Sequence, residues 1–181
     1  MGGERFTIRD GTGADAQAVC EIYRPVVEHT AISFETRPPS VAEIRERIVA
    51  AVATLPWLLA DADERVVGYA YASEHRARAA YRWSVDTSVY VASEWQRQGV
   101  ARALYASLME RLAALGYVNA FAGITLPNPA SVALHESVGF TPVGVFRSVG
   151  YKLGAWRDVG WWALQLTEPV AEPEEPRRSG R

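Results

Sequence analysis

The chain has 181 residues, of which 49% are hydrophobic and 22% charged, and its net charge is −2, which is typical of one globular domain. It lacks the basic stripe of a nucleic-acid-binding protein, and no apolar run approaches the roughly 20 residues that span a bilayer. The single cysteine, Cys20, excludes an internal disulfide and a cysteine metal cluster. We therefore expect no nucleic-acid partner, no membrane partner and no metal.

Hydrophobic periodicity and turn residues divide the chain into strands and helices. The predicted elements, in order, are strand 6–9, helix 15–29, helix 40–53, strands 57–60 and 65–73, strand 84–91, helix 99–115, strand 118–124, helix 128–138, and strands 140–151 and 157–166. Ser40 and Glu43 form a capping-box pattern, and Gly116 and Gly139 follow the ends of two predicted helices.

Strands mixed with helices, with several hairpins, predict an α/β or α+β sandwich. We find no internal repeat, so residues 1–166 are expected to form a single domain. The remaining residues, 167–181, are rich in Pro, Glu and Arg, and we expect them to be disordered. The first ten residues contain no apolar core of a secretory signal, which favours a cytoplasmic location.

The most informative segment joins the predicted strand 84–91 to the predicted helix 99–115. It reads Ala92-Ser93-Glu94-Trp95-Gln96-Arg97-Gln98-Gly99-Val100-Ala101. A polar loop that opens a helix turns backbone N–H groups toward one point, where the helix dipole favours an anion such as a diphosphate. Gly99 permits close approach of the backbone, while Arg97 and Arg102 add positive charge. An ordinary strand–loop–helix connection remains the alternative interpretation.

The motif Gln96-x-x-Gly99-x-Ala101 resembles the Gln/Arg-x-x-Gly-x-Gly/Ala signature of GNAT acetyltransferases, which bind the pyrophosphate of acetyl-CoA. A second run, from Asn128 to His135 and followed by Gly139-Phe140, is similar to the Asn-x-x-Ala-x-x-Leu-Tyr and Gly-Phe run of the same family. The resemblance implies a mixed, mostly antiparallel central sheet flanked by helices.

Over residues 6–166 the chain looks like the phosphinothricin and methionine sulfoximine N-acetyltransferase branch. The similar stretches are Ile32–Thr36, Tyr81–Trp83, Ser88–Val91, Leu126–Asn128, Leu134–Phe140 and Gly154–Val159. The resemblance implies an enzyme that moves the acetyl group of acetyl-CoA to the amino group of a small acidic amino-acid analogue by direct attack. It also implies a homodimer, with which the many late aromatic residues are consistent.

Acetyl transfer needs a neutral amine, a donor for the oxyanion and a proton for the leaving thiolate. In the resembling branch a carboxylate just before the Ser/Thr-Val-Tyr-Val strand is the base, and here Asp86 holds that place, one methylene shorter than the usual Glu. His135 stands where most GNAT enzymes have a Tyr that protonates the thiolate. The backbone N–H of Val91 is the implied oxyanion donor.

The resemblance also implies two sets of binding residues. The expected acetyl-CoA contacts are Val89, Tyr90, Val91, Gln96, Arg97, Gln98, Gly99, Val100, Ala101, Arg102, Asn128 and Ser131. The expected acceptor contacts are Phe34, Arg76, Arg78 and Tyr81. Two arginines can hold acidic groups by forked hydrogen bonds, although a solvated loop is the simpler interpretation of this segment.

Three other functions remain possible from the sequence. A GNAT enzyme for another small amine or a peptide N-terminus fits the same motifs, although the arginines argue against a polyamine. A non-catalytic module that binds acetyl-CoA also fits. A nucleotide site is disfavoured, because the chain has no Gly-x-x-x-x-Gly-Lys-Ser/Thr run.

Overall fold

The computed structural model describes residues 5–179 of the chain. Two segments lie outside the described residues: 1–4, the start of the stretch expected to hold no secretory signal, and 180–181, the end of the expected tail. The elements are β1 (Thr7–Asp10), α1 (Ala16–His29), α2 (Val41–Val52), β2 (Trp57–Ala62), β3 (Arg65–Glu74), β4 (Ser84–Val91), α3 (Val100–Leu115), β5 (Asn119–Leu126), α4 (Pro129–Ser137), β6 (Thr141–Lys152) and β7 (Ala155–Gln165). Short 3₁₀ turns cover Gly13–Asp15, Ala79–Tyr81 and Ser93–Trp95.

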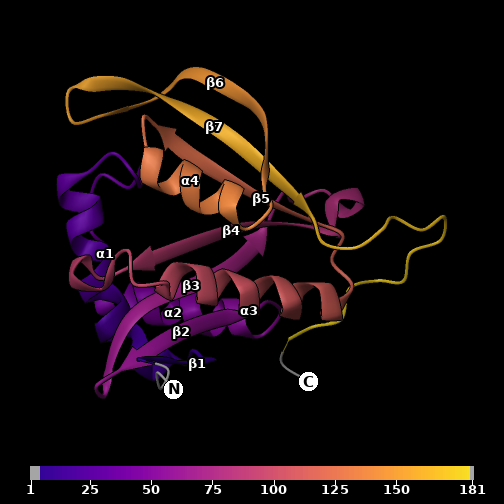
Figure 1. Cartoon of the computed structure of the whole chain (residues 1–181), viewed down its shortest axis with the longest axis horizontal. Coiled ribbons are helices and arrows are strands. Elements are labelled where there is room, and N and C mark those ends of the chain that lie inside the picture. The colour runs from indigo at the N-terminus through magenta and orange to yellow at the C-terminus, as the bar shows by residue number, and fades with distance from the viewer. Residues whose placement is uncertain (1–4, 180–181) are drawn as a thin grey trace.

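The seven strands form one sheet in the order β1-β2-β3-β4-β5-β7-β6 (Figure 1). Every neighbouring pair is antiparallel except β4 and β5, which are parallel. The predicted mixed, mostly antiparallel sheet with flanking helices is therefore confirmed. Among the described residues, no helix combines the length and apolar character that a bilayer crossing demands.

Helices cover both faces of the sheet, and each face has its own hydrophobic core. On one face, α3 buries Leu104, Leu108 and Leu112 against alanine-rich strand surfaces. On the other face, α1 and α2 pack on an aromatic layer in which Trp57 stacks on Tyr71 at 4.3 Å between ring centroids. Alternation along each strand sends successive side chains to opposite cores. Figure 1 shows α3 crossing the strands, and the β6–β7 hairpin curling away from the rest of the sheet.

Helix ends follow the local signals in the sequence. Ser40 and Glu43 form the predicted capping box at α2, with the Ser40 side chain accepting from the Glu43 N–H. Gly116 ends α3 at φ 94°, a left-handed conformation that glycine adopts without a Cβ penalty. The strand predicted at 84–91 is found there, whereas the predicted hairpin turn at 61–64 is shorter, because β2 continues to Ala62.

The C-terminal tail follows β7. Its described part, 167–179, contains no helix or strand and returns along the body of the protein (Figure 1). The indole of Trp83 donates to the Glu174 carbonyl at 2.8 Å, Arg82 pairs with Glu175, and the Arg177 N–H donates to the Leu115 carbonyl at 2.8 Å. An extended Pro-rich segment forms no internal hydrogen bonds, so its backbone groups are free to bond with the body of the protein. These contacts hold the tail in place.

Candidate active site

The parallel strands β4 and β5 separate in the middle of the sheet. Their register contains three pairs, Ser84 with Asn119, Val85 with Ala120 and Asp86 with Phe121. Beyond Asp86 the two strands diverge, and a cavity of about 60 Å³ lies between them. The cavity is bordered from both faces of the sheet, by Ile32 on one side and by Tyr105 and His135 on the other. The gap therefore connects the two faces.

The unpaired edge of β4 presents backbone groups to this gap. The Ala92 N–H donates to the Val67 carbonyl on β3 at 2.9 Å. Because backbone polar groups of a strand point alternately to its two sides, those of Val89 and Val91 point to the β5 side, where the ladder is interrupted. Unpaired backbone groups at such an edge are ready to bind an extended, amide-containing ligand.

The loop after β4 connects the open edge of this strand to the start of α3. Gly99 has φ 88° and is the N-cap of the helix, and no side chain caps the first turn. A Cβ at Gly99 would meet no atom within 4 Å, so the space above it is open. Arg97, at φ 59°, and Arg102 are exposed on the same loop and first turn. Free N–H groups, a positive dipole end and two arginines together fit a diphosphate.

The remaining expected contacts on this loop vary in exposure. Gln96 and Gln98 are exposed, and Gln98 donates to the Glu94 carbonyl at 2.7 Å. Val100 is buried against the core, and Ala101 is partly buried. The ring of Tyr90 lies on the opposite face of the sheet, with its centroid 5.0 Å from that of Tyr23.

Helix α4 borders the gap from the α3 side. Asn128 caps it, because its side chain accepts from the Ser131 N–H at 3.1 Å, and both residues line the cavity. His135, which is 4% exposed, also lines it. The His135 Nδ1 lies 2.7 Å from the Ser131 carbonyl oxygen, and its Nε2 lies 2.9 Å from the Tyr105 hydroxyl. Burial lowers the pKa of His135, which favours the neutral ring, with Nδ1–H donating to the carbonyl.

Asp86 lies on the opposite face of the sheet, the face that α1 and α2 cover, because it alternates with the buried residues Val85 and Thr87. Its Oδ1 is 2.6 Å from the Nδ1 of His75, a residue that the sequence did not single out. Burial raises the pKa of Asp86, while the hydrogen bond to His75 and the charges of His75 and Arg76 act in the opposite direction. Asp86 and His135 thus border the gap from different faces.

The expected acceptor residues Arg76, Arg78 and Tyr81 lie together at the end of β3. They border a cavity of about 240 Å³ that Glu175 and Pro176 of the tail also line. The Arg76 guanidinium lies 5.8 Å from the centroid of the Trp161 ring. Basic and aromatic groups therefore gather beside Asp86, on the face opposite His135.

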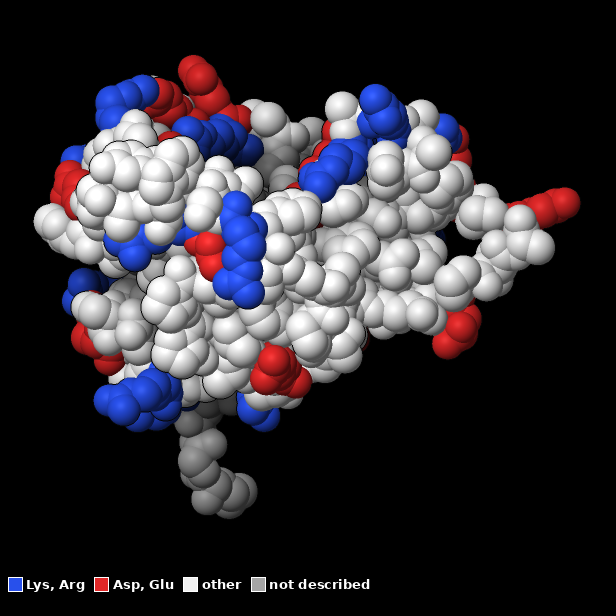
Figure 2. Space-filling model, turned by 90° about the horizontal axis from the view of Figure 1, so that it is seen from above, with Lys and Arg blue, Asp and Glu red and all other residues white. Residues whose placement is uncertain are grey.

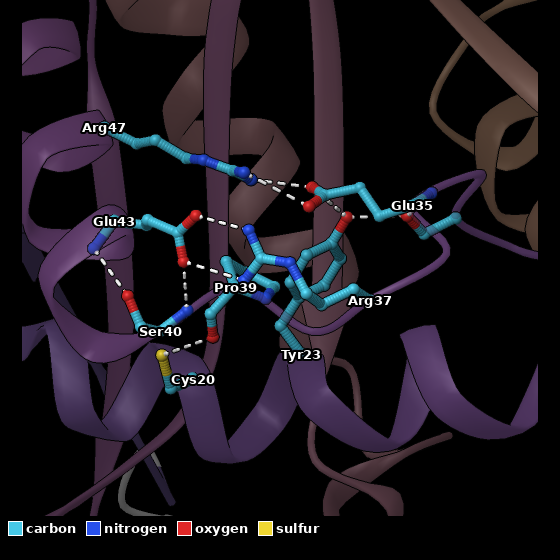
Figure 3. A network of polar contacts seen from close by, with 9 residues as sticks. Cys20, Tyr23, Glu35, Arg37, Pro39, Ser40, Glu43 and Arg47 are labelled. Atoms are coloured by element: carbon cyan, nitrogen blue, oxygen red, sulfur yellow. Dashed lines mark hydrogen bonds and ion pairs between the residues drawn. The ribbon is translucent and has the colours of Figure 1, made fainter.

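The fourth expected acceptor residue, Phe34, belongs to the loop 30–39 between α1 and α2. A polar network holds this loop to the helices (Figure 3). The Tyr23 hydroxyl lies 2.6 Å from the Ser33 hydroxyl and donates to Glu35 at 3.0 Å, and Arg47 donates to both oxygens of Glu35 at 2.6 and 3.1 Å. The ion pair with Arg47 lowers the pKa of Glu35.

Three polar features of this face escaped the sequence analysis. Lys152 is buried, and its Nζ donates to the carbonyls of Val27 and Ser33, at 2.7 Å each. Among the described residues, Arg157 Nε and Trp161 Nε1 are buried donors without a hydrogen-bond partner. Both belong to the face of β7 that looks toward the acceptor residues, and unsatisfied donors of this kind suit an acceptor with anionic or carbonyl groups.

Known proteins resemble this chain over most of its length. The sequence profile of the acetyltransferase (GNAT) domain matches residues 8–161. The phosphinothricin N-acetyltransferase of Streptomyces viridochromogenes is 39% identical over 94% of this chain and 92% of its own. The L-methionine sulfoximine/L-methionine sulfone acetyltransferase of Salmonella typhimurium is 34% identical over 92% of this chain and 98% of its own.

Solved structures share the whole fold. A GNAT superfamily phosphinothricin acetyltransferase from Sinorhizobium meliloti, in complex with acetyl-CoA, superposes with a TM-score of 0.91 at 36% identity, covering 98% of this chain and 97% of that one. An acetyltransferase from Salmonella typhimurium with acetyl-CoA gives 0.89 at 34% identity, covering 93% and 98%. The chain belongs to the GNAT acetyltransferase family. It is an acetyl-CoA-dependent N-acetyltransferase.

Proposed function

We propose that this enzyme acetylates the amino group of a small acidic amino-acid analogue of the phosphinothricin, methionine sulfoximine or methionine sulfone type. The observation that carries the proposal is the gap between β4 and β5, which residues of both faces of the sheet border. At its closed end, Asp86 lies beside His75, with the charge of Arg76 and the ring of Tyr81 nearby. The names of the relatives support a small amino-acid-like acceptor.

Acetyl-CoA supplies an activated acetyl group, and the residues of the gap position it. We assign the diphosphate to the N–H groups and arginines at 96–102, and the extended arm to the open edge of β4 at Val89 and Val91. The hydroxyl of Ser131 and the amide of Asn128 border the same space from α4. The Val91 N–H is assigned to the carbonyl oxygen, where a backbone donor stabilises developing negative charge.

We assign removal of the amine proton to the pair formed by Asp86 and His75, which is hydrogen-bonded to it. The position of Asp86 on the acceptor face, at the last paired row before the gap, supports this role. His135 is assigned to the opposite side, where its ring is hydrogen-bonded to the Tyr105 hydroxyl, and we assign protonation of the leaving sulfur to this pair. The hydrogen-bonded pair of Tyr105 and His135 can pass a proton to the thiolate while both side chains start neutral.

We assign the acidic groups of the acceptor to Arg76 and Arg78, with Tyr81 and Phe34 as walls. The buried, unpartnered donor of Arg157 adds a third basic group on this face. An acceptor with two anionic or strongly polar groups matches these cations, whereas a polyamine would be repelled.

The experiment is a thiol-release assay with acetyl-CoA and a panel of acceptors: phosphinothricin, methionine sulfoximine, methionine sulfone, neutral amino acids, spermidine and a peptide. We expect turnover with the first three acceptors. Replacing Arg76 and Arg78 by Ala should raise KM for those acceptors at least tenfold, which corresponds to about 1.4 kcal/mol, with KM for acetyl-CoA within twofold. Preference for the peptide or spermidine would refute the acceptor class.

We also propose a homodimer that forms through the β6–β7 hairpin. Its exposed apolar residues are Val143, Val145, Phe146, Val149, Tyr151, Leu153 and Trp156. Viewed from above, this side of the molecule is broadly uncharged, with scattered charges of both signs (Figure 2). An apolar surface of this extent is typical of a protein–protein interface. A cytoplasmic location completes the proposal, since Cys20 is a free, buried thiol.

A further inference from the structure

His75 lies across the point where β4 and β5 part. Its Nδ1 is 2.6 Å from Oδ1 of Asp86 on β4. Its ring stacks on Phe121 of β5, with 4.4 Å between centroids and 22° between planes. Asp86 and Phe121 form the last register pair of the two strands. One imidazole therefore contacts both strands at the closed end of the gap, on the acceptor face.

The second ring nitrogen of His75 is free. The side chain is 13% exposed. The rings of Tyr81 and Trp161 each lie 6.0 Å from the imidazole, centroid to centroid, in T-shaped geometry. Among the described residues, Nε2 has no hydrogen-bond partner and is not one of the buried unpartnered nitrogens. Solvent or a substrate can therefore reach Nε2, while Asp86 holds the other side of the ring.

We propose that His75 is the group that accepts the proton of the substrate amine, through Nε2, and that Asp86 orients its ring. This inference rests on the proposed function and makes its proton step specific. A carboxylate that accepts Nδ1–H fixes the tautomer with the lone pair on Nε2. Imidazole changes charge between pH 5 and 8, so it takes up and returns a proton near neutral pH more readily than an ordinary carboxyl group.

Several groups set the charge around this imidazole. Asp86 approaches from β4 with a carboxylate oxygen at Nδ1. Arg76 holds its guanidinium over the ring of Trp161 of β7, which also lies beside the imidazole. Tyr81 contributes a phenol from its 3₁₀ turn, and Phe121 of β5 carries no charge. Water contact at Nε2 lets the proton leave after the reaction.

The step balances without another reactant. The lone pair of the neutral amine forms a bond to the carbonyl carbon of the acetyl group, and the proton of that nitrogen moves to Nε2. The C–S bond breaks, its electron pair leaves on sulfur, and the sulfur is protonated from the His135 side. The imidazolium of His75 then returns its proton to water, so that an amide and a thiol are the products.

The test separates a proton acceptor from a residue that only positions Asp86. In His75→Asn the amide nitrogen lies near the former Nδ1, so the bond to Asp86 is preserved while Nε2 and the titratable ring are lost. We expect kcat for the best acceptor to fall about 100- to 10,000-fold, with KM for acetyl-CoA within twofold. The acidic limb of kcat/KM against pH should disappear.

If His75→Asn keeps both the activity and the acidic limb, the proposal is overturned, while the proposed function stands. If the unaltered protein turns over no acceptor, the proposed function fails, and this assignment fails with it. Should His75→Asn fold poorly, His75→Gln and His75→Phe, which preserves the stack on Phe121, provide the same kinetic comparison in variants with a measured Tm.

A second measurement does not depend on turnover. The chain has three histidines, so ¹⁵N spectra of the rings can be assigned by single substitutions. We expect His75 to be the Nδ1–H tautomer, and we expect Asp86→Asn to shift it toward the other tautomer. An Nε2–H tautomer in the unaltered protein would leave no lone pair to accept the proton, and would overturn the proposal.

Discussion

Gly150 of β6 lies directly beneath the ring of Phe34. A Cβ at position 150 would come within 2.1 Å of the Phe34 Cε2 atom. The loop 30–39 and the β6–β7 hairpin, which are far apart in sequence, therefore share a contact that only glycine permits. Because Phe34 is 39% exposed, its ring can move outward when this contact is crowded.

Gly150→Ala should displace the Phe34 ring and thereby change the acceptor site without unfolding the protein. We expect KM for the acceptor to rise about tenfold, since overpacking costs about 1–3 kcal/mol, while KM for acetyl-CoA stays within twofold. Gly144→Ala is the matched control, because a Cβ at position 144 on the same strand meets no atom within 4 Å. Equal effects of both variants would contradict a specific role of this contact.

Gly99→Ala should weaken acetyl-CoA binding. Gly99 has φ 88°, and a left-handed residue with a Cβ costs about 1–2 kcal/mol, which corresponds to a 5- to 30-fold increase in Kd. Calorimetry with acetyl-CoA measures this change. Gly154→Ala is the control, since Gly154 has φ 74° and equally open surroundings in the β6–β7 turn. The assignment of the phosphate loop fails if Gly154→Ala weakens binding as much.

Lys152→Met should destabilise the fold. Lys152 is 6% exposed and satisfies the carbonyls of Val27 and Ser33. Leaving buried acceptors unpaired costs about 1–3 kcal/mol, which lowers Tm by about 2–12 °C in a domain of this size. Arg147→Met removes an exposed ion pair with Asp158 on the same hairpin and should change Tm by far less. Thermal unfolding at one protein concentration compares them.

Glu35 should contribute to the pH dependence of stability. Its ion pair with Arg47 lowers its pKa below the ordinary 4.5, so the folded state favours the carboxylate. The contribution is therefore complete above pH 4.5 and is lost as the pH falls through the folded value. Glu35→Gln should flatten the fall of Tm below pH 4.5. Glu46→Gln, an exposed position on α2, is the control, and an unchanged slope in Glu35→Gln would argue against the prediction.

Trp156→Ser should convert the proposed dimer into a monomer. Trp156 is 65% exposed, and its ring lies 5.4 Å from that of Tyr151 on the neighbouring strand. Light scattering should give about twice the chain mass of 19.9 kDa for the unaltered protein and one chain mass for the variant. Val49→Ser removes an exposed apolar side chain from α2 and should leave the mass unchanged. A monomeric unaltered protein would refute the interface.

Local signals in the sequence were sufficient for most of the fold. Ser40, Gly116 and Gly139 act within one turn of their own elements, so periodicity and capping locate the helices without knowledge of the tertiary structure. The strand 84–91 was placed correctly because alternation is a property of adjacent residues. The pairing order of strands, and the tail that returns to Trp83, depend on contacts that no local pattern encodes.

The same distinction applies to the site. Gly99 and its loop could be located because one continuous segment carries that geometry. His75 was missed because its contact with Asp86 depends on the register of β3 and β4. That register aligns Ser73 with Asp86 and brings residue 75 close to the carboxylate. Lys152 was missed because a lone lysine near a turn normally lies in solvent, and only the folded loop 30–39 supplies its carbonyl partners.

The separation of β4 from β5 has a consequence for the stability and abundance of the protein in a cell. Under the proposed binding mode, acetyl-CoA fills this opening and binds only the folded chain, and therefore stabilises the protein against unfolding. A co-substrate present at a hundredfold excess over its Kd would add about 2.7 kcal/mol. The amount of intact enzyme would then rise and fall with the acetyl-CoA supply, since degradation acts on the opened chain.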